Sequence, residues 1–220
     1  MSWPTTADEL AAWQEELARR RVRAWSPAPA SAVGACVVCF PRGKTGAGAR
    51  GDRAWAAAVA RGDTAVVRGE AGARYVPGLL ALREGPLLEA AVRALPRAPD
   101  MLLVDATGRD HPRRGGLATS LGAVLELPTV GVTHRPLLAT GEWPADRRGA
   151  VAPLRAGDEI VGCWLRVQAG VRPLAVHPAW RTDLEAAIAV VLGATPRVRT
   201  PEPLRVARTA ARRARAADMG

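Results

Sequence analysis

The stretch PLLEAAVRALPRAPDMLLVDATG, residues 86–108, places an amphipathic segment directly before an apolar run that ends in a carboxylate. Apolar residues recur at helical spacing over 87–95, and proline is favoured in the first turn of a helix. The apolar run is typical of a buried strand. We therefore predict a helix that begins at Pro86 and leads into a strand at 101–105, with Asp105 at the mouth of that strand.

Strands and helices are predicted on both sides of this unit. Upstream, the pattern predicts a helix at 5–24, a strand at 32–40 and a hairpin formed by 54–60 and 64–69. Downstream, it predicts helices at 116–125, 181–193 and 201–216, a strand at 129–133, and a hairpin formed by 160–167 and 172–176. Early antiparallel strands followed by alternating helices and strands indicate an α/β protein with a mixed sheet flanked by helices.

Length and composition favour one domain. A chain of 220 residues with 48% hydrophobic content can bury one core. We predict a single domain over 1–220, with a flexible Gly-rich loop at 41–53 and a basic C-terminal helix at 201–216. The sequence has no apolar run of about eighteen residues and no secretory signal pattern, so we expect a cytoplasmic monomer with no membrane partner.

The charge of the chain indicates an anionic partner. The formal net charge is +10, and nucleic acid, DNA or RNA, is the first candidate. Lys44 is the only lysine, so part of the arginine excess reflects codon usage. Residues 197–215 carry seven arginines against Glu202 alone. Such a run is more often a solvated helix face than a specific site, although it suffices for non-specific phosphate contact.

Four short motifs surround the central strand: YVPG at 75–78, REGP at 83–86, VDATG at 104–108 and HPRR at 111–114. In this order they resemble the endonuclease V family, which nicks nucleic acid near deaminated adenine (inosine) with a divalent metal. GV at 131–132 and PEP at 201–203 extend the resemblance over nearly the whole chain. The resemblance implies a ribonuclease-H-like mixed sheet, and metal-dependent phosphodiester hydrolysis in DNA repair at deoxyinosine.

The same resemblance assigns roles to individual residues. Glu84 and Asp105 match carboxylates that bind Mg²⁺ or Mn²⁺, since hard cations prefer oxygen ligands. The wedge that the family inserts beside the modified base is matched by Tyr75, Val76, Pro77 and Gly78, and an aromatic face stacks on an unpaired base. The segment near the scissile phosphate is matched by His111, a candidate catalytic residue, and by Arg113 and Arg114, candidate nucleic-acid-binding residues.

Other positions depart from the family pattern. Cys36 stands where the resemblance places a metal-binding aspartate, and a thiol is largely protonated at neutral pH and prefers softer ions. His134, a candidate for nucleic-acid binding, replaces a lysine. Trp180 replaces a histidine and has no lone pair for a metal. His177 is near enough in sequence to substitute, but the simpler interpretation is that it ends a strand.

Cys36 and Cys39 also have the spacing of half a zinc or redox site. No second C-x-x-C pair exists, and Cys163 stands alone. We predict that these cysteines are small buried side chains.

The departures leave two hypotheses. In the first, Glu84 and Asp105 hold a metal, more weakly than in the family, and the chain is a working endonuclease. In the second, the chain is a catalytically inactive pseudoenzyme that binds nucleic acid without cleaving it. Losing a metal-binding carboxylate forfeits several kcal/mol of transition-state stabilisation, and each ~1.4 kcal/mol is tenfold in rate. We therefore expect weak or absent cleavage. A third hypothesis, an assembly partner unrelated to nucleic acid, leaves the basic charge and the wedge unexplained.

Overall fold

The structure, a computed structural model, describes residues 2–20, 22–28, 30–43, 46–196 and 198–219. Residues 44 and 45 of the predicted Gly-rich loop, and residue 197 of the basic segment, lie outside the described residues. Among the described residues, no helix is long and apolar enough to cross a membrane.

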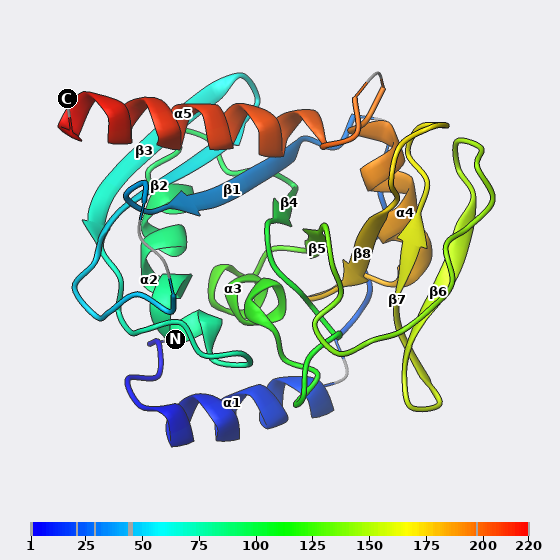
Figure 1. The fold of residues 1–220 in the computed structure, drawn as a ribbon, viewed down its shortest axis with the longest axis horizontal. Coiled ribbons are helices and arrows are strands. Elements are labelled where there is room, and N and C mark those ends of the chain that lie inside the picture. Colours follow the sequence, from blue (N-terminus) through cyan, green and yellow to red (C-terminus); the bar gives the residue numbers. More distant parts are fainter. Residues whose placement is uncertain (1, 21, 29, 44–45, 197, 220) are drawn as a thin grey trace.

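The core of the fold is one mixed sheet (Figure 1). Its strands are β1 (Val33–Cys39), β2 (Arg53–Ala60), β3 (Asp63–Glu70), β4 (Met101–Val104), β5 (Thr129–Thr133), β6 (Val151–Ala156), β7 (Glu159–Leu165) and β8 (Leu174–Pro178). Their spatial order is β3-β2-β1-β4-β5-β8-β7-β6. β1, β4 and β5 run parallel to one another, and the outer strands pair antiparallel. The predicted α/β class with a mixed sheet is confirmed.

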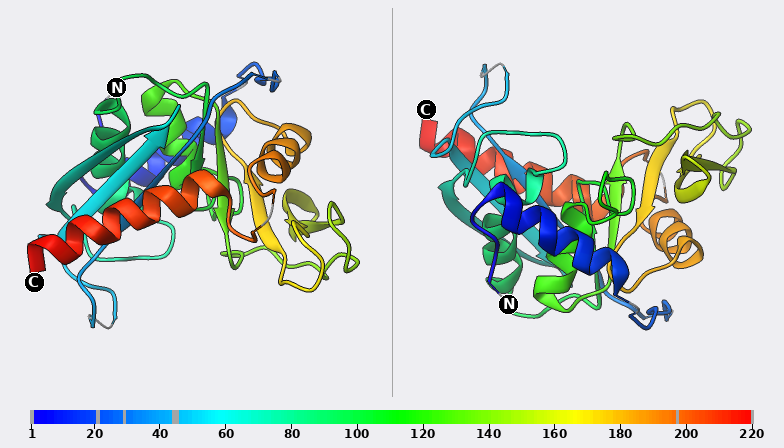
Figure 2. Two further views of the ribbon diagram at one scale, coloured as in Figure 1. Left: turned by 90° about the horizontal axis from the view of Figure 1, so that it is seen from above. Right: turned by 90° about the horizontal axis from the view of Figure 1, so that it is seen from below.

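Helices cover both faces of the sheet. They are α1 (Ala7–Arg19), α2 (Leu80–Arg93), α3 (Leu117–Leu125), α4 (Leu184–Gly193) and α5 (Glu202–Met219). Figure 1 and the two views of Figure 2 show α5 lying along one face of β1 and β2, with α2 and α3 on the other face and α1 outside them. α4 packs against β7 and β8 and shares a hydrophobic core with α5.

Alternation along β1 decides which side chains meet which helices. Ala35 and Val37 point into the core beneath α4 and α5. Cys36 points into the opposite core, with Val104 and the apolar faces of α2 and α3. The sheet register places Cys36 directly beside Val104, so the residue that follows Val104 lies near the Cys36 end of the sheet.

The start of α2 corrects one prediction. The helix begins at Leu80, and Pro86 lies within it rather than in its first turn. Proline has no N–H to donate inside a helix, but Pro86 lies on the exposed side of α2. The backbone N–H of Gly72 donates to the carbonyl of Arg83 in the same stretch (3.1 Å). As a result, the REGP motif is helical and Glu84 has a fixed place beside the sheet.

Two smaller differences concern the ends of the fold. α1 is shorter than predicted because Arg20 is extended, although Thr6 and Glu9 form the expected capping box. β6 was not predicted. It is an edge strand, mostly exposed, with Pro153 inside it, and such strands lack the apolar alternation of a half-buried strand.

Candidate functional site

The candidate carboxylates come together at one end of the sheet. Glu84 lies on α2, and Asp105 follows the last residue of β4. Both line a cavity of about 240 Å³ together with Cys36 of β1 and Tyr75. The structure therefore brings together four of the residues that the sequence singled out, from four separate parts of the chain.

The carboxyl group of Glu84 lies in a buried environment. Burial raises its pKa to about 7, and the nearby charge of Asp105 acts in the same direction, against the opposing charge of Arg83. Glu84 is therefore protonated more readily than an exposed glutamate. A protonated carboxyl group is a poor ligand for a hard cation.

Cys36 is buried between these groups and β1. Burial raises the pKa of its thiol far above the usual range, and the carboxylates of Asp105 and Glu84 raise it further. The thiol therefore stays protonated, and its sulfur is not a ligand that Mg²⁺ prefers. Among the residues that the structure describes, no group of three or more His, Cys, Asp or Glu side chains is arranged to hold a metal ion.

Asp105 has a cationic partner that the sequence did not reveal. Arg208 of α5 donates from Nη2 to Asp105 Oδ2 at 2.6 Å. Side-chain exposure is 24% for Arg208 and 38% for Asp105, so the pair lies at the rim of the site. The sequence identified the basic helix but not this contact.

The YVPG segment forms a tight, exposed turn above the cavity. Tyr75 is 42% exposed, and its backbone N–H donates to the Ala47 carbonyl (2.7 Å). The turn closes with a bond from Leu79 N–H to the Val76 carbonyl (2.9 Å), and Gly78 has φ +80, which favours glycine. The aromatic ring of Tyr75 is thus presented to solvent by a backbone held at both ends.

His111 and Arg113 hold this turn from below. His111 Nε2 lies 3.0 Å from the Gly78 carbonyl oxygen, and Arg113 Nη2 donates to the same oxygen at 2.9 Å. Arg113 N–H donates to His111 Nδ1, so the proton of the neutral ring is on Nε2 and is donated to Gly78. Burial is the main reason that the pKa of His111 falls to about 4. His111 therefore supports the wedge, and within the described part of the chain its ring makes no hydrogen bond to Glu84 or Asp105.

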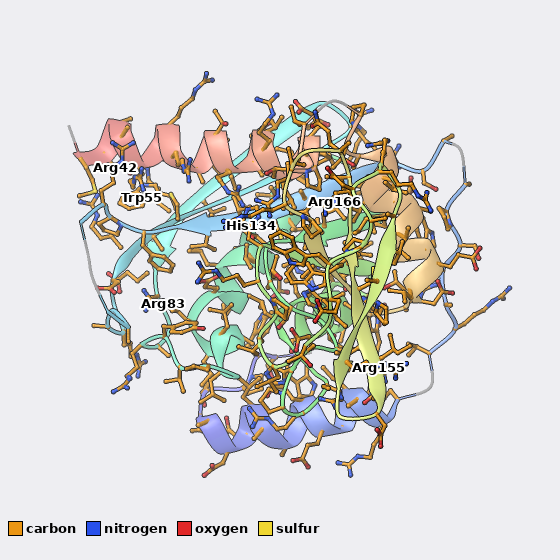
Figure 3. The ribbon with its side chains drawn as sticks, turned by 45° about the vertical axis from the view of Figure 1, so that its right-hand side comes forward. Arg42, Trp55, Arg83, His134, Arg155 and Arg166 are labelled. Atoms are coloured by element: carbon orange, nitrogen blue, oxygen red, sulfur yellow. The ribbon has the colours of Figure 1, made fainter. Side chains whose placement is uncertain are left out.

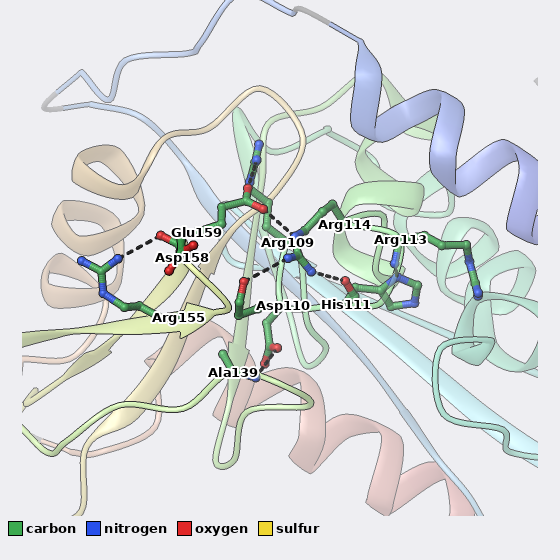
Figure 4. A network of polar contacts seen from close by, with 10 residues as sticks. Arg109, Asp110, His111, Arg113, Arg114, Ala139, Arg155, Asp158 and Glu159 are labelled. Carbon is green, nitrogen blue, oxygen red and sulfur yellow. Dashed lines mark hydrogen bonds and ion pairs between the residues drawn. The ribbon is translucent and has the colours of Figure 1, made fainter.

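The remaining arginine of the HPRR motif points elsewhere. Arg114 donates to Glu159 Oε2 at 2.7 Å, and Arg109 pairs with the same carboxylate (Figure 4). Arg114 also donates to the His111 carbonyl at 2.8 Å. The motif therefore ties the segment after β4 to β7, and Arg114 is bound to protein groups.

A second cavity, of about 290 Å³, adjoins the wedge. Tyr75 and Gly78 form one side, and Asp105 and Thr133 form the other. The apolar part of its wall comes from Leu80, Leu117, Pro136 and Leu137. Its volume lies near the lower end of the range for small-molecule sites, roughly 300 Å³.

His134 lies at the end of β5, beneath α5 in the view of Figure 3. It is exposed, and its pKa is lowered chiefly by partial desolvation and then by the charge of Arg199. Asp105 and Arg208 are also near enough to influence it. His134 therefore lies within electrostatic reach of the carboxylate site.

Trp180, which stands where the family resemblance places a histidine, lies away from this site. Its carbonyl accepts from Thr129 N–H at the start of β5, whereas Asp105 follows the end of β4, which runs parallel to β5. The indole packs against Leu17 and Ala123. His177 is buried within β8, where its Nε2 lies 3.0 Å from Thr133 Oγ1, so it is a residue of the sheet interior.

Cys36 and Cys39 point to opposite faces of β1 and pack in different cores. They cannot bind one ion together, because side chains an odd number of residues apart on a strand diverge.

Two residues that hold the site were missed. Gln14 of α1 is buried, and its Oε1 accepts from Arg113 Nε at 2.8 Å. A signal existed, because Gln14 falls on the apolar face of α1 with Leu10 and Leu17. Arg83 is buried against Asp52 (Nη2 to Oδ2 3.2 Å) and lies 4.1 Å from the Phe40 ring centroid (Figure 3).

Comparison with known proteins identifies the family. The family profile described as Endonuclease V matches residues 42–209. Endonuclease V of Streptomyces avermitilis is 41% identical over 215 residues, covering 96% of this chain and 93% of that protein. Endonuclease V of Roseiflexus sp. (strain RS-1) is 37% identical over 212 residues, covering 93% and 91%.

Solved structures agree. The crystal structure of the Streptomyces avermitilis endonuclease V superposes with a TM-score of 0.88 at 39% identity, covering 100% of this chain and 97% of that one. The catalytic domain of human endonuclease V gives a TM-score of 0.81 at 28% identity, covering 98% and 99%. The ribonuclease-H-like fold that the motifs implied is thereby confirmed, and the chain belongs to the endonuclease V family.

Proposed function

We propose that this chain recognises nucleic acid at a deaminated or unpaired base, and that its metal-dependent cleavage of the phosphodiester backbone is lost or severely impaired. The observation that carries the proposal is the place of Cys36, whose protonated thiol shares one cavity with Glu84 and Asp105. This is the place where the family resemblance puts a metal-binding aspartate.

The donor set argues against a divalent metal of the kind that family membership implies. Mg²⁺ needs near-octahedral oxygen ligands, and Mn²⁺ also prefers them. Here one ligand position is a thiol, Glu84 is partly protonated at neutral pH, and Asp105 is paired with Arg208. These residues do not fit Mg²⁺ or Mn²⁺ well, so we expect weak metal binding and derive no catalytic step from it.

The recognition half of the proposal rests on the wedge and the cavity beside it. Proteins that act on a base inside a duplex take it out of the stack, and an aromatic side chain fills or borders the gap. Tyr75 is exposed on a turn that Gly78, His111 and Arg113 hold in place. The adjoining cavity offers apolar walls for a flat base and polar groups at Asp105 and Thr133.

One observation favours the second candidate, a working endonuclease. Glu84 and Asp105 still line one cavity next to the wedge, and two carboxylates with water can hold a single ion. In that case the active metal would be Mn²⁺ or Mg²⁺, and the natural substrate would be DNA in repair of deoxyinosine, as the family resemblance implies.

The experiment that separates the candidates uses labelled DNA with a single inosine, its RNA counterpart, and matched strands with adenine. Binding is followed by fluorescence anisotropy, and cleavage on denaturing gels with Mg²⁺ and with Mn²⁺. We expect salt-sensitive binding that favours the inosine strand, and no cleavage above background. Tyr75→Ala should weaken the binding roughly tenfold, since stacking on an aromatic ring contributes about 1–3 kcal/mol per base.

Tyr75→Phe is the matched control, because it keeps the aromatic face, and its affinity should stay near that of the native chain. Cleavage by the native chain that Asp105→Ala abolishes would establish the working enzyme and refute the loss of catalysis. Equal affinity for inosine and adenine strands, unchanged by Tyr75→Ala, would refute recognition through the wedge.

A further inference from the structure

Helix α5 brings a fixed positive charge to the carboxylate site. Arg208 reaches Asp105 over the end of the sheet, and 103 residues of sequence separate the two. Nη2 donates to Oδ2 at 2.6 Å, which is short for a bond between a guanidinium and a carboxylate. The guanidinium therefore lies directly on the carboxylate that the family resemblance assigns to metal binding.

Further basic groups surround this pair. Arg199 and His134 are within electrostatic reach of one another, and His134 is also within reach of Arg208. Arg135 lines the cavity beside the wedge together with Asp105. Arg199 itself is anchored by bonds to the carbonyls of Arg172 (2.7 Å) and Pro173 (2.9 Å), so its charge is held in place.

The charge balance of this end of the sheet suits a phosphate. A group of ionised carboxylates repels a phosphate until a divalent cation bridges them. Here Cys36 adds no charge, and the charge of Arg208 cancels that of Asp105. Glu84 contributes at most one negative charge, whereas Arg199 and Arg135 together contribute two positive charges. The surroundings are therefore net positive, which attracts a nucleic-acid backbone without any added ion.

Arg208 also has N–H groups that form no hydrogen bond to the described residues. A guanidinium carries five N–H groups, and among the described residues its one hydrogen bond is the bond from Nη2 to Asp105. Its side chain is 24% exposed and is bonded to Asp105, which lines both cavities, so a phosphate oxygen can reach it from solvent. Arginine binds phosphate oxygens in pairs through its planar fork of donors.

We propose that Arg208 takes over the role of the divalent cation, so that a backbone phosphate of the bound strand contacts Arg208 beside Asp105 and binding needs no metal. This inference rests on the proposed function, because it concerns the same bound nucleic acid. It identifies the place of the phosphate and a residue of α5 as the group that neutralises it.

The test measures binding of the inosine-containing single strand by anisotropy, in chelator and in Mg²⁺, over a series of salt concentrations. The native chain should bind equally well in chelator and in Mg²⁺. Arg208→Gln should bind several-fold more weakly and should reduce the slope of log affinity against log salt by about 0.7, the value for one phosphate contact on a single strand. Arg208→Lys keeps the charge but loses the planar fork, so it should keep the salt slope of the native chain and lose part of its affinity.

Two further variants make the result specific. Arg213→Gln removes the same charge from an exposed place on the same helix, and its slope should match that of the native chain. Asp105→Asn removes the competing carboxylate and should tighten binding in chelator, whereas a site that needs a metal on Asp105 would lose affinity.

The outcomes separate this inference from the proposed function. Binding that appears only with Mg²⁺, or an Arg208→Gln variant with native affinity and slope, would overturn the role of Arg208 and leave recognition of nucleic acid intact. Failure of the native chain to bind any of the strands under any condition would overturn the proposed function and this inference with it.

Discussion

His111 Nε2 lies 3.0 Å from the carbonyl oxygen of Gly78, and this bond joins the segment after β4 to the turn that presents Tyr75. The two residues are 33 positions apart. The histidine is 3% exposed, and its other ring nitrogen accepts the backbone N–H of Arg113. His111 therefore supports the wedge, and both of its ring nitrogens are hydrogen-bonded to protein groups.

Removing this support should cost stability and order at the wedge. We expect His111→Ala to lower the free energy of unfolding by roughly 1–3 kcal/mol, because the backbone N–H of Arg113 loses its acceptor in a partly buried place. Urea unfolding followed by tryptophan fluorescence measures the change. His134→Ala is the control, since that histidine is exposed and its loss should leave the unfolding midpoint unchanged. Equal midpoints for the two variants would show that His111 is not a structural support.

The same residue predicts a dependence on pH. Burial lowers the pKa of His111 to about 4 in the folded chain, from about 6.5 in an exposed histidine. Between these values the unfolded chain binds a proton that the folded chain does not, so stability falls as the solution is acidified. The contribution is complete above pH ~6.5 and is lost as the pH falls to about 4, and it amounts to roughly 3 kcal/mol.

The measurement is the free energy of unfolding at several pH values across this window, for the native chain and for His111→Gln. The variant should give a flatter profile, because it has no proton to take up at this position. Carboxylates and His177 contribute equally to both chains, so the difference isolates His111. Parallel profiles would refute the lowered pKa.

The centre of the fold could be predicted because its signals are local. The apolar runs before Asp105 and around Cys36 each lie within a few residues, and both strands formed as expected. The start of α2 could not be predicted from Pro86. Packing of Ala81, with the partly buried Leu80 and Leu82, in the core beneath the sheet extends the helix toward its N-terminus and outweighs the cost of an internal proline.

The residues of the site likewise divide into those that a local sequence signal reveals and those that it does not. Glu84, Asp105 and Tyr75 could be found because short motifs carry them. The position of Trp180 depends on strand order: β8 is antiparallel to β5, so the chain beyond β8 leaves the Asp105 end of the sheet. No local pattern indicates the contact of Arg208 with Asp105, because it depends on the path of α5 across the sheet.

The buried pair of Arg83 and Asp52 should be important for stability. The side chain of Arg83 is 6% exposed and that of Asp52 is 5% exposed. Arg83 also donates to the carbonyls of Ala49 (3.2 Å) and Ala73 (2.6 Å). Arg83→Met should lower the free energy of unfolding by roughly 3–5 kcal/mol, because Asp52 stays buried and loses the guanidinium charge. Chemical denaturation measures this loss.

Arg97→Met is the matched control, because Arg97 pairs with Asp63 at 3.1 Å but is 62% exposed. Exposed pairs contribute little, so its unfolding midpoint should stay near that of the native chain. If the two variants unfold at the same denaturant concentration, the buried pair has no special role in holding α2 to the loop segments.

The last prediction concerns the metal. Cys36→Asp restores a carboxylate between Glu84 and Asp105, and we expect it to destabilise the chain in chelator, because like charges are then crowded in a buried place. Mn²⁺ should restore the melting temperature of this variant, since an ion that binds the folded state alone stabilises it by about 2.7 kcal/mol at a hundred times its Kd. Adding Arg208→Ala should strengthen the response by freeing Asp105. Cys39→Asp, which adds the same charge on the opposite face of β1, should not respond to Mn²⁺. A native chain whose melting temperature already rises with Mn²⁺, and no longer does so after Asp105→Asn, would show that the thiol and Arg208 leave the metal site usable.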